Sequence, residues 1–129
     1  MINTLELNDL LRTIAHEARQ VIQTDEYVVF LYDPAEQILK PVVCEQEQYV
    51  EETLAIRLKP GEGFTGRVYE QGRGEIFNDV INDPRGYQIP GTPVENTVVL
   101  AVPLETRDEV IGVVTLVRTS DRPFHTPDL

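Results

Sequence analysis

The fold of this chain is decided by the stretch Thr97-Val-Val-Leu-Ala-Val-Pro-Leu104, which is almost wholly apolar. An apolar run rich in β-branched residues is typical of a strand that is covered on both faces. A short segment, residues 105–108, separates it from a second such run at residues 109–118. A connection this short predicts an antiparallel hairpin, and we expect its two strands to be central in a sheet.

Further strands are expected upstream of this hairpin. Residues 26–32 and 38–44 are rich in β-branched and aromatic side chains, and turn-forming residues join them into a second predicted hairpin. Pro41 interrupts the later strand, which indicates a sheet edge or a bulge. Residues 53–58 alternate between apolar and polar side chains and predict a third strand, and residues 75–80 predict a short one.

Helices are expected at two places before the central hairpin. Apolar residues recur every three or four positions between Leu7 and Ile22, so this segment predicts an amphipathic helix with His16 off its apolar stripe. Residues 67–71 predict a short helix that ends at Gly72. The polar residues 45–52 are expected to form a loop or one helical turn.

The last residues have the features of a helix start. Thr126-Pro-Asp128 offers a capping hydroxyl, then proline at the first helical position, then an acid. Since the sequence stops at Leu129, we expect one domain over residues 1–129 that is cut within or before its final helix.

The composition describes an ordinary folded domain with an acidic surface. The 129 residues are 41% hydrophobic, and 11 basic against 22 acidic residues give a formal net charge of −11. That length fits one domain, and that charge argues against nucleic-acid phosphates and anionic membrane surfaces as partners. The sequence has no secretory signal and no apolar run near the roughly 20 residues of a membrane helix. We therefore expect a cytoplasmic domain.

The residues that usually carry metal or nucleophilic chemistry are few. Cys44 is the only cysteine, which excludes an internal disulfide and a paired-cysteine metal knuckle. His16 and His125 are far apart in the sequence and make no metal-ligand set, so neither a metal nor heme is expected. Neither histidine adjoins a serine or Cys44, so no nucleophile–base pair is indicated and we expect no enzyme.

Six motifs, in their order along the chain, resemble a GAF domain from about residue 8 to residue 129. They are Asn8-Asp-Leu-Leu-Arg-Thr-Ile14, Gly61-Glu-Gly-Phe-Thr-Gly-Arg-Val68, Asn78-Asp-Val-Ile-Asn-Asp-Pro84, the two central runs Thr97–Leu104 and Val110–Leu116, and Arg122-Pro-Phe-His-Thr-Pro-Asp-Leu129. A glycine-rich loop alone is a common motif, whereas the six together are more specific. A PAS-type fold is the alternative, and Val102-Pro-Leu104 and the segment around Phe124 favour GAF.

The resemblance implies an α+β fold with a central six-stranded antiparallel sheet. Helices would cover one face of the sheet. The other face would be covered by a crossover, the segment of loop and short helices that precedes the central hairpin. Ligands in this family bind between sheet and crossover, and many members dimerise through their terminal helices. Such domains usually regulate histidine kinases, cyclases, phosphodiesterases or transcription regulators. The resemblance therefore implies a non-catalytic sensor from a larger signalling protein, forming a homodimer and binding an unknown small molecule.

Several ligand classes of that family lack their signature here. Bilin-binding members attach the pigment to a cysteine in the crossover, whereas Cys44 lies in a predicted strand. Sulfoxide-reducing members need several cysteines to form and resolve a disulfide. The spaced motifs of cyclic-nucleotide members are absent, since neither Lys40 nor Lys59 follows an asparagine. Covalent bilin is therefore not expected, and a cyclic nucleotide has no support.

A ligand site would draw its polar groups from the crossover and the central strands. The candidates are Phe64, Thr65, Asn78, Asp79, Tyr87, Asn96, Thr97 and Thr115. Five of them have a structural alternative: Phe64 as core packing, Asn78 and Asp79 as caps, Tyr87 as a surface ring, and Thr115 as a hydroxyl bonded to the backbone. Asn96 and Thr97 open the central strand, where either face of the sheet is open to them. A further alternative is that the domain binds no ligand and serves as a dimerisation or protein-interaction module.

Overall fold

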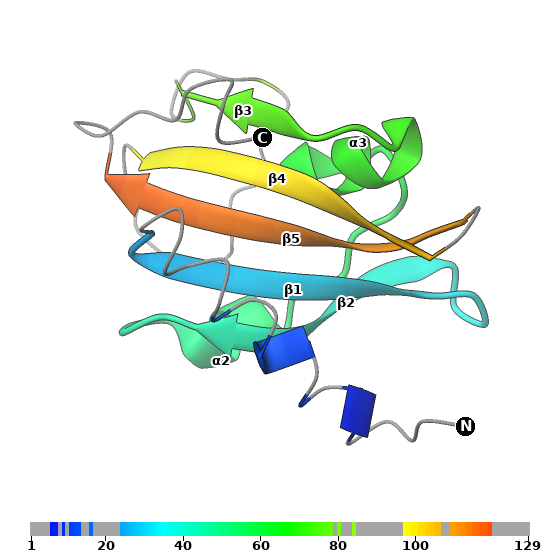
Figure 1. Cartoon of the computed structure of the whole chain (residues 1–129), viewed down its shortest axis with the longest axis horizontal. Coiled ribbons are helices and arrows are strands. Elements are labelled where there is room, and N and C mark those ends of the chain that lie inside the picture. Colours follow the sequence, from blue (N-terminus) through cyan, green and yellow to red (C-terminus); the bar gives the residue numbers. More distant parts are fainter. Residues whose placement is uncertain are drawn as a thin grey trace.

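The computed structural model describes residues 6, 7, 9, 11–13, 16, 24–78, 80, 84, 97–106 and 109–119. A five-stranded antiparallel sheet forms its centre, with strand order β2-β1-β5-β4-β3 (Figure 1). The strands are β1 (Glu26–Asp33), β2 (Ile38–Glu45), β3 (Glu75–Phe77), β4 (Thr97–Thr106) and β5 (Glu109–Thr119). The predicted antiparallel α+β class is confirmed, as is the hairpin of β4 and β5 inside the sheet.

The predicted strand at residues 53–58 is wrong. The helix α2 (Val50–Leu54) takes up its start, and Leu58 makes only an isolated bridge with Leu39. The amides of Ala55 and Ile56 bond to the carbonyls of Glu51 and Thr53, so they are committed to local turns instead of a ladder. The described residues form five strands, and the expected sixth is not confirmed.

Pro41 lies where its missing amide is tolerated. β2 is the edge strand next to β1 in the described sheet, and the register shifts between Val29, opposite Val43, and Phe30, opposite Pro41. Edge strands and bulges are the places in sheets where proline is found. Both expectations for Pro41 are thus confirmed.

The helix α3 (Gly63–Gln71) begins earlier than the predicted residues 67–71, inside the glycine-rich motif. The amide of Gly61 bonds to the carbonyl of Gly66, which folds the loop back onto the helix. A Cβ atom at position 66 would lie 2.6 Å from the carbonyl oxygen of Lys59, so only glycine fits there. The helix ends at Gly72 in the left-handed conformation, as predicted.

The two faces of the sheet have different cores. One face carries a hydrophobic cluster that includes Leu11 of the first helical segment: Leu11, Tyr27, Val29, Val43, Val98, Leu100, Val114 and Leu116. His16 is exposed, as predicted. The other face, here called the α3 face, carries two clusters, one around Val28, Phe30 and Leu39 and one around Val68, Phe77 and Val113.

Figure 1 shows α3 at the end of the sheet where the β1–β2 and β4–β5 turns lie. The expected final helix and most of the expected crossover fall outside the described residues.

Candidate functional site

Strand register places polar side chains from four strands on the α3 face. Thr97 pairs with Thr119, four residues along β5 from Thr115, so these two threonines lie roughly 13 Å apart along the strands. Val28 lies opposite Cys44 of β2 and Thr115 of β5, and Thr115 lies opposite Ala101 of β4. Side chains alternate along a strand, so Glu26 shares the face of Val28, and Thr97 shares that of Ala101. We call this group the Thr115 end, and it consists of Glu26, Val28, Cys44, Thr97, Thr115 and Val117.

The Thr115 end has a buried floor and a half-buried margin. Val28 and Thr115 are 6% and 7% exposed, whereas the side chains of Glu26, Cys44, Thr97 and Val117 are half-buried. The Thr115 end therefore places a carboxylate, a thiol and two hydroxyls on an otherwise apolar face.

Thr115 makes the backbone bond that was its structural alternative. Its hydroxyl Oγ1 donates to the carbonyl oxygen of Val28 at 3.4 Å, which confirms the predicted backbone bond. That distance is near the upper limit of a hydrogen bond, so the bond is weak. The side chain also belongs to the α3 face, where its oxygen lone pairs can accept from a ligand.

Cys44 is neutral in this environment. Burial and the nearby negative charge of Glu26 raise the pKa of its thiol to about 11. The thiolate is the form that attacks and binds metals, so a protonated Cys44 acts as a small, weakly polar contact. Among the described residues, no group of three or more His, Cys, Asp or Glu side chains could hold a metal ion.

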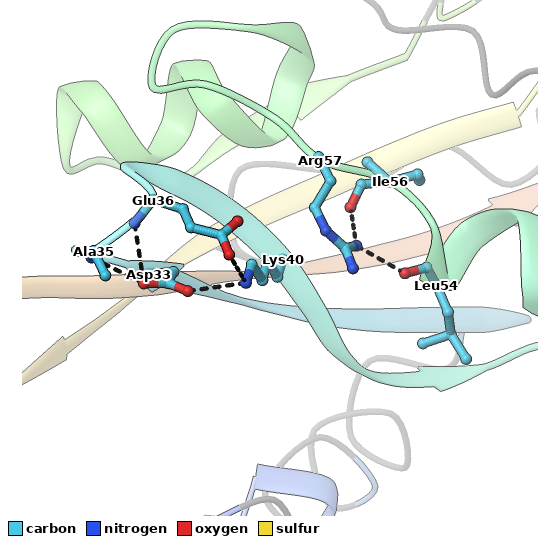
Figure 2. Close-up of polar contacts among 7 residues, drawn as sticks. All are labelled: Asp33, Ala35, Glu36, Lys40, Leu54, Ile56 and Arg57. Carbon is cyan, nitrogen blue, oxygen red and sulfur yellow. Dashed lines mark hydrogen bonds and ion pairs between the residues drawn. The ribbon is translucent and has the colours of Figure 1, made fainter.

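Three of the described cations are held by neighbouring groups. Lys40 bridges Asp33 and Glu36 at 2.9 and 3.1 Å in the β1–β2 hairpin (Figure 2). Arg67 pairs with Glu75 at 3.1 Å.

The guanidinium of Arg57, near α2, is bound by backbone carbonyls and not by carboxylates. It donates to the carbonyls of Leu54 and Ile56, as Figure 2 also shows. Among the six residues of the Thr115 end, Glu26 is the acidic one.

The helix α3 covers the adjoining part of the same face, and Val117 packs against the cluster of Val68, Phe77 and Val113 there. Phe64 packs on Phe77 with ring centroids 4.0 Å apart, and Tyr69 stacks on Tyr32 at 4.9 Å. Burial, with smaller contributions from Tyr32 and Glu109, raises the pKa of Tyr69. Phe64 therefore serves as core packing, the structural alternative for this residue.

The structure does not gather the described candidate residues into one group. Thr97 and Thr115 lie on the same face of the sheet but four residues apart along the β4–β5 ladder, and Phe64 and the buried Thr65 lie on α3. Asn78 is exposed just after β3. Asp79, Tyr87 and Asn96 lie outside the described residues, and their roles stay predictions.

Sequence reasoning missed Glu26 as a site residue. An acidic residue at the start of a strand resembles a simple boundary, and its own segment does not show which side chains lie beside it. The available signal was the alternation that puts Glu26, Val28 and Phe30 on one face.

A family model described as "GAF domain" matches residues 4–129 of the chain. No curated protein matches the sequence. In the part of the chain that is described, no helix is long and apolar enough to cross a membrane.

Three similar solved structures illustrate the fold. The GAF domain/HD domain protein from Geobacter sulfurreducens is 20% identical, with a TM-score of 0.80 over 95% of this chain and 82% of that one. A Staphylococcus aureus NreA protein mutated in its nitrate binding site is 20% identical, with a TM-score of 0.78 over 96% of this chain and 94% of that one. A free methionine-R-sulfoxide reductase from Thermoplasma acidophilum is 16% identical, with a TM-score of 0.69 over 95% and 84%. At these identities the likeness extends to the fold.

Proposed function

Since the chain belongs to the GAF domain family, we propose that it is a non-catalytic sensor that binds a small molecule at the Thr115 end. The observation that carries the proposal is that strand register places Glu26, Cys44 and Thr115 around Val28 on three neighbouring strands of the α3 face. Binding there would regulate a neighbouring domain of a larger signalling protein. The domain would act in the cytoplasm as a homodimer through its terminal helices.

The thiol chemistry supports a sensor over an enzyme. A sulfoxide reductase shares the fold, but disulfide exchange requires an attacking thiolate and a second thiol. Cys44 is the only cysteine, and its raised pKa keeps the thiol protonated near neutral pH.

Native mass spectrometry of the purified protein tests the proposal. We expect a co-purified small molecule, and we expect the double variant Thr97→Val and Thr115→Val to lose most of it. Thr106→Val is the matched control, because Thr106 is an exposed hydroxyl at the far end of β4. Equal occupancy in the double variant and the wild type would contradict a ligand at the Thr115 end.

A second candidate function is a protein-interaction module that needs no ligand. Among the described residues, Tyr49 and Leu54 are the large hydrophobic side chains that are exposed, at 37% and 39%, and both lie at α2. Sedimentation at micromolar concentration discriminates between the candidates. Self-association that Leu54→Ser abolishes, with no bound small molecule, would favour the interaction module.

A further inference from the structure

We infer that α2 is a docking surface for a basic, amphipathic segment of another protein. Its two exposed hydrophobic side chains, Tyr49 and Leu54, lie at the two ends of the helix. The inference goes beyond the proposed sensor function and does not rest on a ligand at the Thr115 end. It gives the second candidate function, the interaction module, a partner of defined chemistry.

The backbone of this surface is held in one conformation by its own hydrogen bonds. The side-chain Nε2 of Gln46 donates to the carbonyl of Gln48 at 2.6 Å and to the hydroxyl of Thr53 at 2.9 Å. The amide of Thr53 donates to the carbonyl of Tyr49 at 3.0 Å, and Thr53 itself is buried. A partner that binds there does not have to order the backbone first, which lowers the entropic cost of binding.

Tyr49 combines an unfavourable backbone conformation with an exposed ring. Its φ of 61° and ψ of 32° are left-handed, a region in which residues other than glycine are uncommon. Burial of the ring within the chain offsets little of that cost, because the residue is exposed. Tyrosine is enriched among the side chains that dominate protein–protein binding, and a partner would bury this ring.

One partner segment can reach both hydrophobic side chains. Leu54 follows Tyr49 by five positions, and a rise of 1.5 Å per residue puts them roughly 8 Å apart along the helix axis. Glu51 lies about 200° around the helix from the buried Thr53, so it points away from the protein interior. Along the helix, a carboxylate therefore lies between two apolar side chains.

The charge around these side chains is acidic. Glu47 and Glu51 are exposed and Glu52 is half-buried, and we call these three the α2 glutamates. Within the part of the chain that the structure describes, their carboxylates make no ion pair and no hydrogen bond. Arg57 is the nearest basic residue in the sequence, and carbonyls bind its guanidinium (Figure 2). Complementary charge speeds association and selects the partner, so this surface favours a cationic one.

The same charge disfavours a second copy of this chain as the occupant. A symmetric contact through α2 would place the α2 glutamates of one copy against those of the other. Like charges brought together in an interface are repulsive, and the formal net charge of −11 adds to the repulsion between copies. The occupant is therefore a different protein, whose docking segment carries lysine or arginine beside apolar side chains.

Three synthetic peptides of equal length test this chemistry. The first has leucine and phenylalanine at helical spacing and lysine elsewhere. The second replaces every lysine by glutamate, and the third keeps the lysines and replaces the apolar residues by serine. We expect the first to bind at least about tenfold more tightly than either of the others and to shift the backbone amide NMR signals of residues 46–54.

Substitutions of the two hydrophobic residues test the apolar contribution. Tyr49→Asn and Leu54→Ser should each weaken binding of the first peptide at least about fivefold. Asparagine adopts the left-handed conformation more readily than tyrosine, so Tyr49→Asn should unfold at an equal or higher urea midpoint. A weaker affinity in a fully folded variant would assign the ring to the partner and not to the fold.

The charge contribution has its own variant and control. Changing the three α2 glutamates to glutamine should weaken binding at least about fivefold and reduce its dependence on salt. The matched control changes Glu70, Glu105 and Glu109, exposed glutamates on α3 and at the β4–β5 turn, to glutamine. It removes the same total charge and should alter the affinity by less than about twofold.

Three results would contradict a basic partner at α2. The first is equal binding of the lysine and glutamate peptides, and the second is the absence of shifts at residues 46–54. The third is a dimer in sedimentation that Leu54→Ser abolishes, because a second copy would then occupy the surface. None of these readouts involves a small molecule, so a failure here leaves the proposed sensor function to its own test, and the reverse also holds.

Discussion

The two ends of the α3 face are built on the same strands but carry different side chains. Under α3, Val68 is fully buried and aromatic rings fill the space. At the Thr115 end, the hydroxyls of Thr97 and Thr115 and the carboxylate of Glu26 project from that same face. The Thr115 hydroxyl bonds to the carbonyl of Val28, and hydroxyl and carboxylate oxygens have further acceptor positions, so these groups can keep their present partners and still contact a ligand. The contrast distinguishes a packed structural end from a candidate binding end.

The largest expected effect comes from breaking the sheet beneath the α3 end. A Cβ atom at position 112 would lie 2.1 Å from the carbonyl oxygen of Phe30, so β1 and β5 would have to separate. We expect Gly112→Ala to lower the free energy of unfolding by at least about 3 kcal/mol, or to prevent folding. Urea unfolding followed by circular dichroism measures this change in the free energy of unfolding.

Gly72→Ala is the control for that variant. Gly72 has a left-handed φ of 70°, but the atom nearest to an added Cβ is 3.7 Å away. Backbone strain alone should cost about 1 kcal/mol. Equal losses in the two variants would contradict the close approach of β1 and β5 at Gly112.

The contrast between buried and half-buried positions on this face is sharpened by one substitution made at both Val68 and Val117, which lie in and against the same cluster. Val68→Ala opens a cavity under α3 and should lower the free energy of unfolding by about 2 kcal/mol. Val117→Ala removes the same methyl groups from a half-buried position and should cost no more than about 1 kcal/mol. The midpoints of denaturant unfolding, compared at equal m-values, measure the loss of stability in each variant. A larger loss at Val117 would mean that the Thr115 end is packed core.

Thr115→Val tests whether the central hydroxyl of the site is needed for folding. The variant keeps the shape of the side chain and removes a weak bond of 3.4 Å to Val28. We expect the free energy of unfolding to change by less than about 1 kcal/mol in either direction. A loss above about 2 kcal/mol would assign the hydroxyl to structure and weaken its assignment to a ligand.

The smallest expected effect concerns Cys44, whose titration reports on Glu26. Only the thiolate reacts with iodoacetamide, so the alkylation rate of the folded protein should rise with an inflection about pH 11, above the ordinary 9.0. Glu26→Gln removes a nearby negative charge and should lower that inflection. An inflection at the ordinary value in the wild type would contradict the burial of Cys44 beside Glu26.

Local sequence patterns predicted most of the sheet. The β-branched runs indicated β1, β2, β4 and β5, and Gly72 marked the end of α3. The alternation at residues 53–58 misled, because Ile56 and Leu58 are buried from an irregular segment while Leu54 is exposed on α2. A short alternating run suits a strand, but it fits other backbones equally well.

The site was less predictable than the fold. Thr97 and Thr115 were candidates, but placing Glu26 and Cys44 beside them requires the pairing of β1 with both β2 and β5. A shift of one residue in that pairing would put a strand's side chains on the opposite face. Register depends on long-range contacts, and no single segment of the sequence contains it.

A small-molecule fragment screen read by valine methyl NMR tests the central claim most directly. Val28 is the reporter of the Thr115 end, whereas Val68 and Val113 share one cluster beside α3, against which Val117 also packs. We predict that bound fragments shift the Val28 signals and leave those of Val68 and Val113 unchanged. Shifts confined to Val68 and Val113, or to Val29 and Val98 on the other face of the sheet, would contradict a binding site at the Thr115 end.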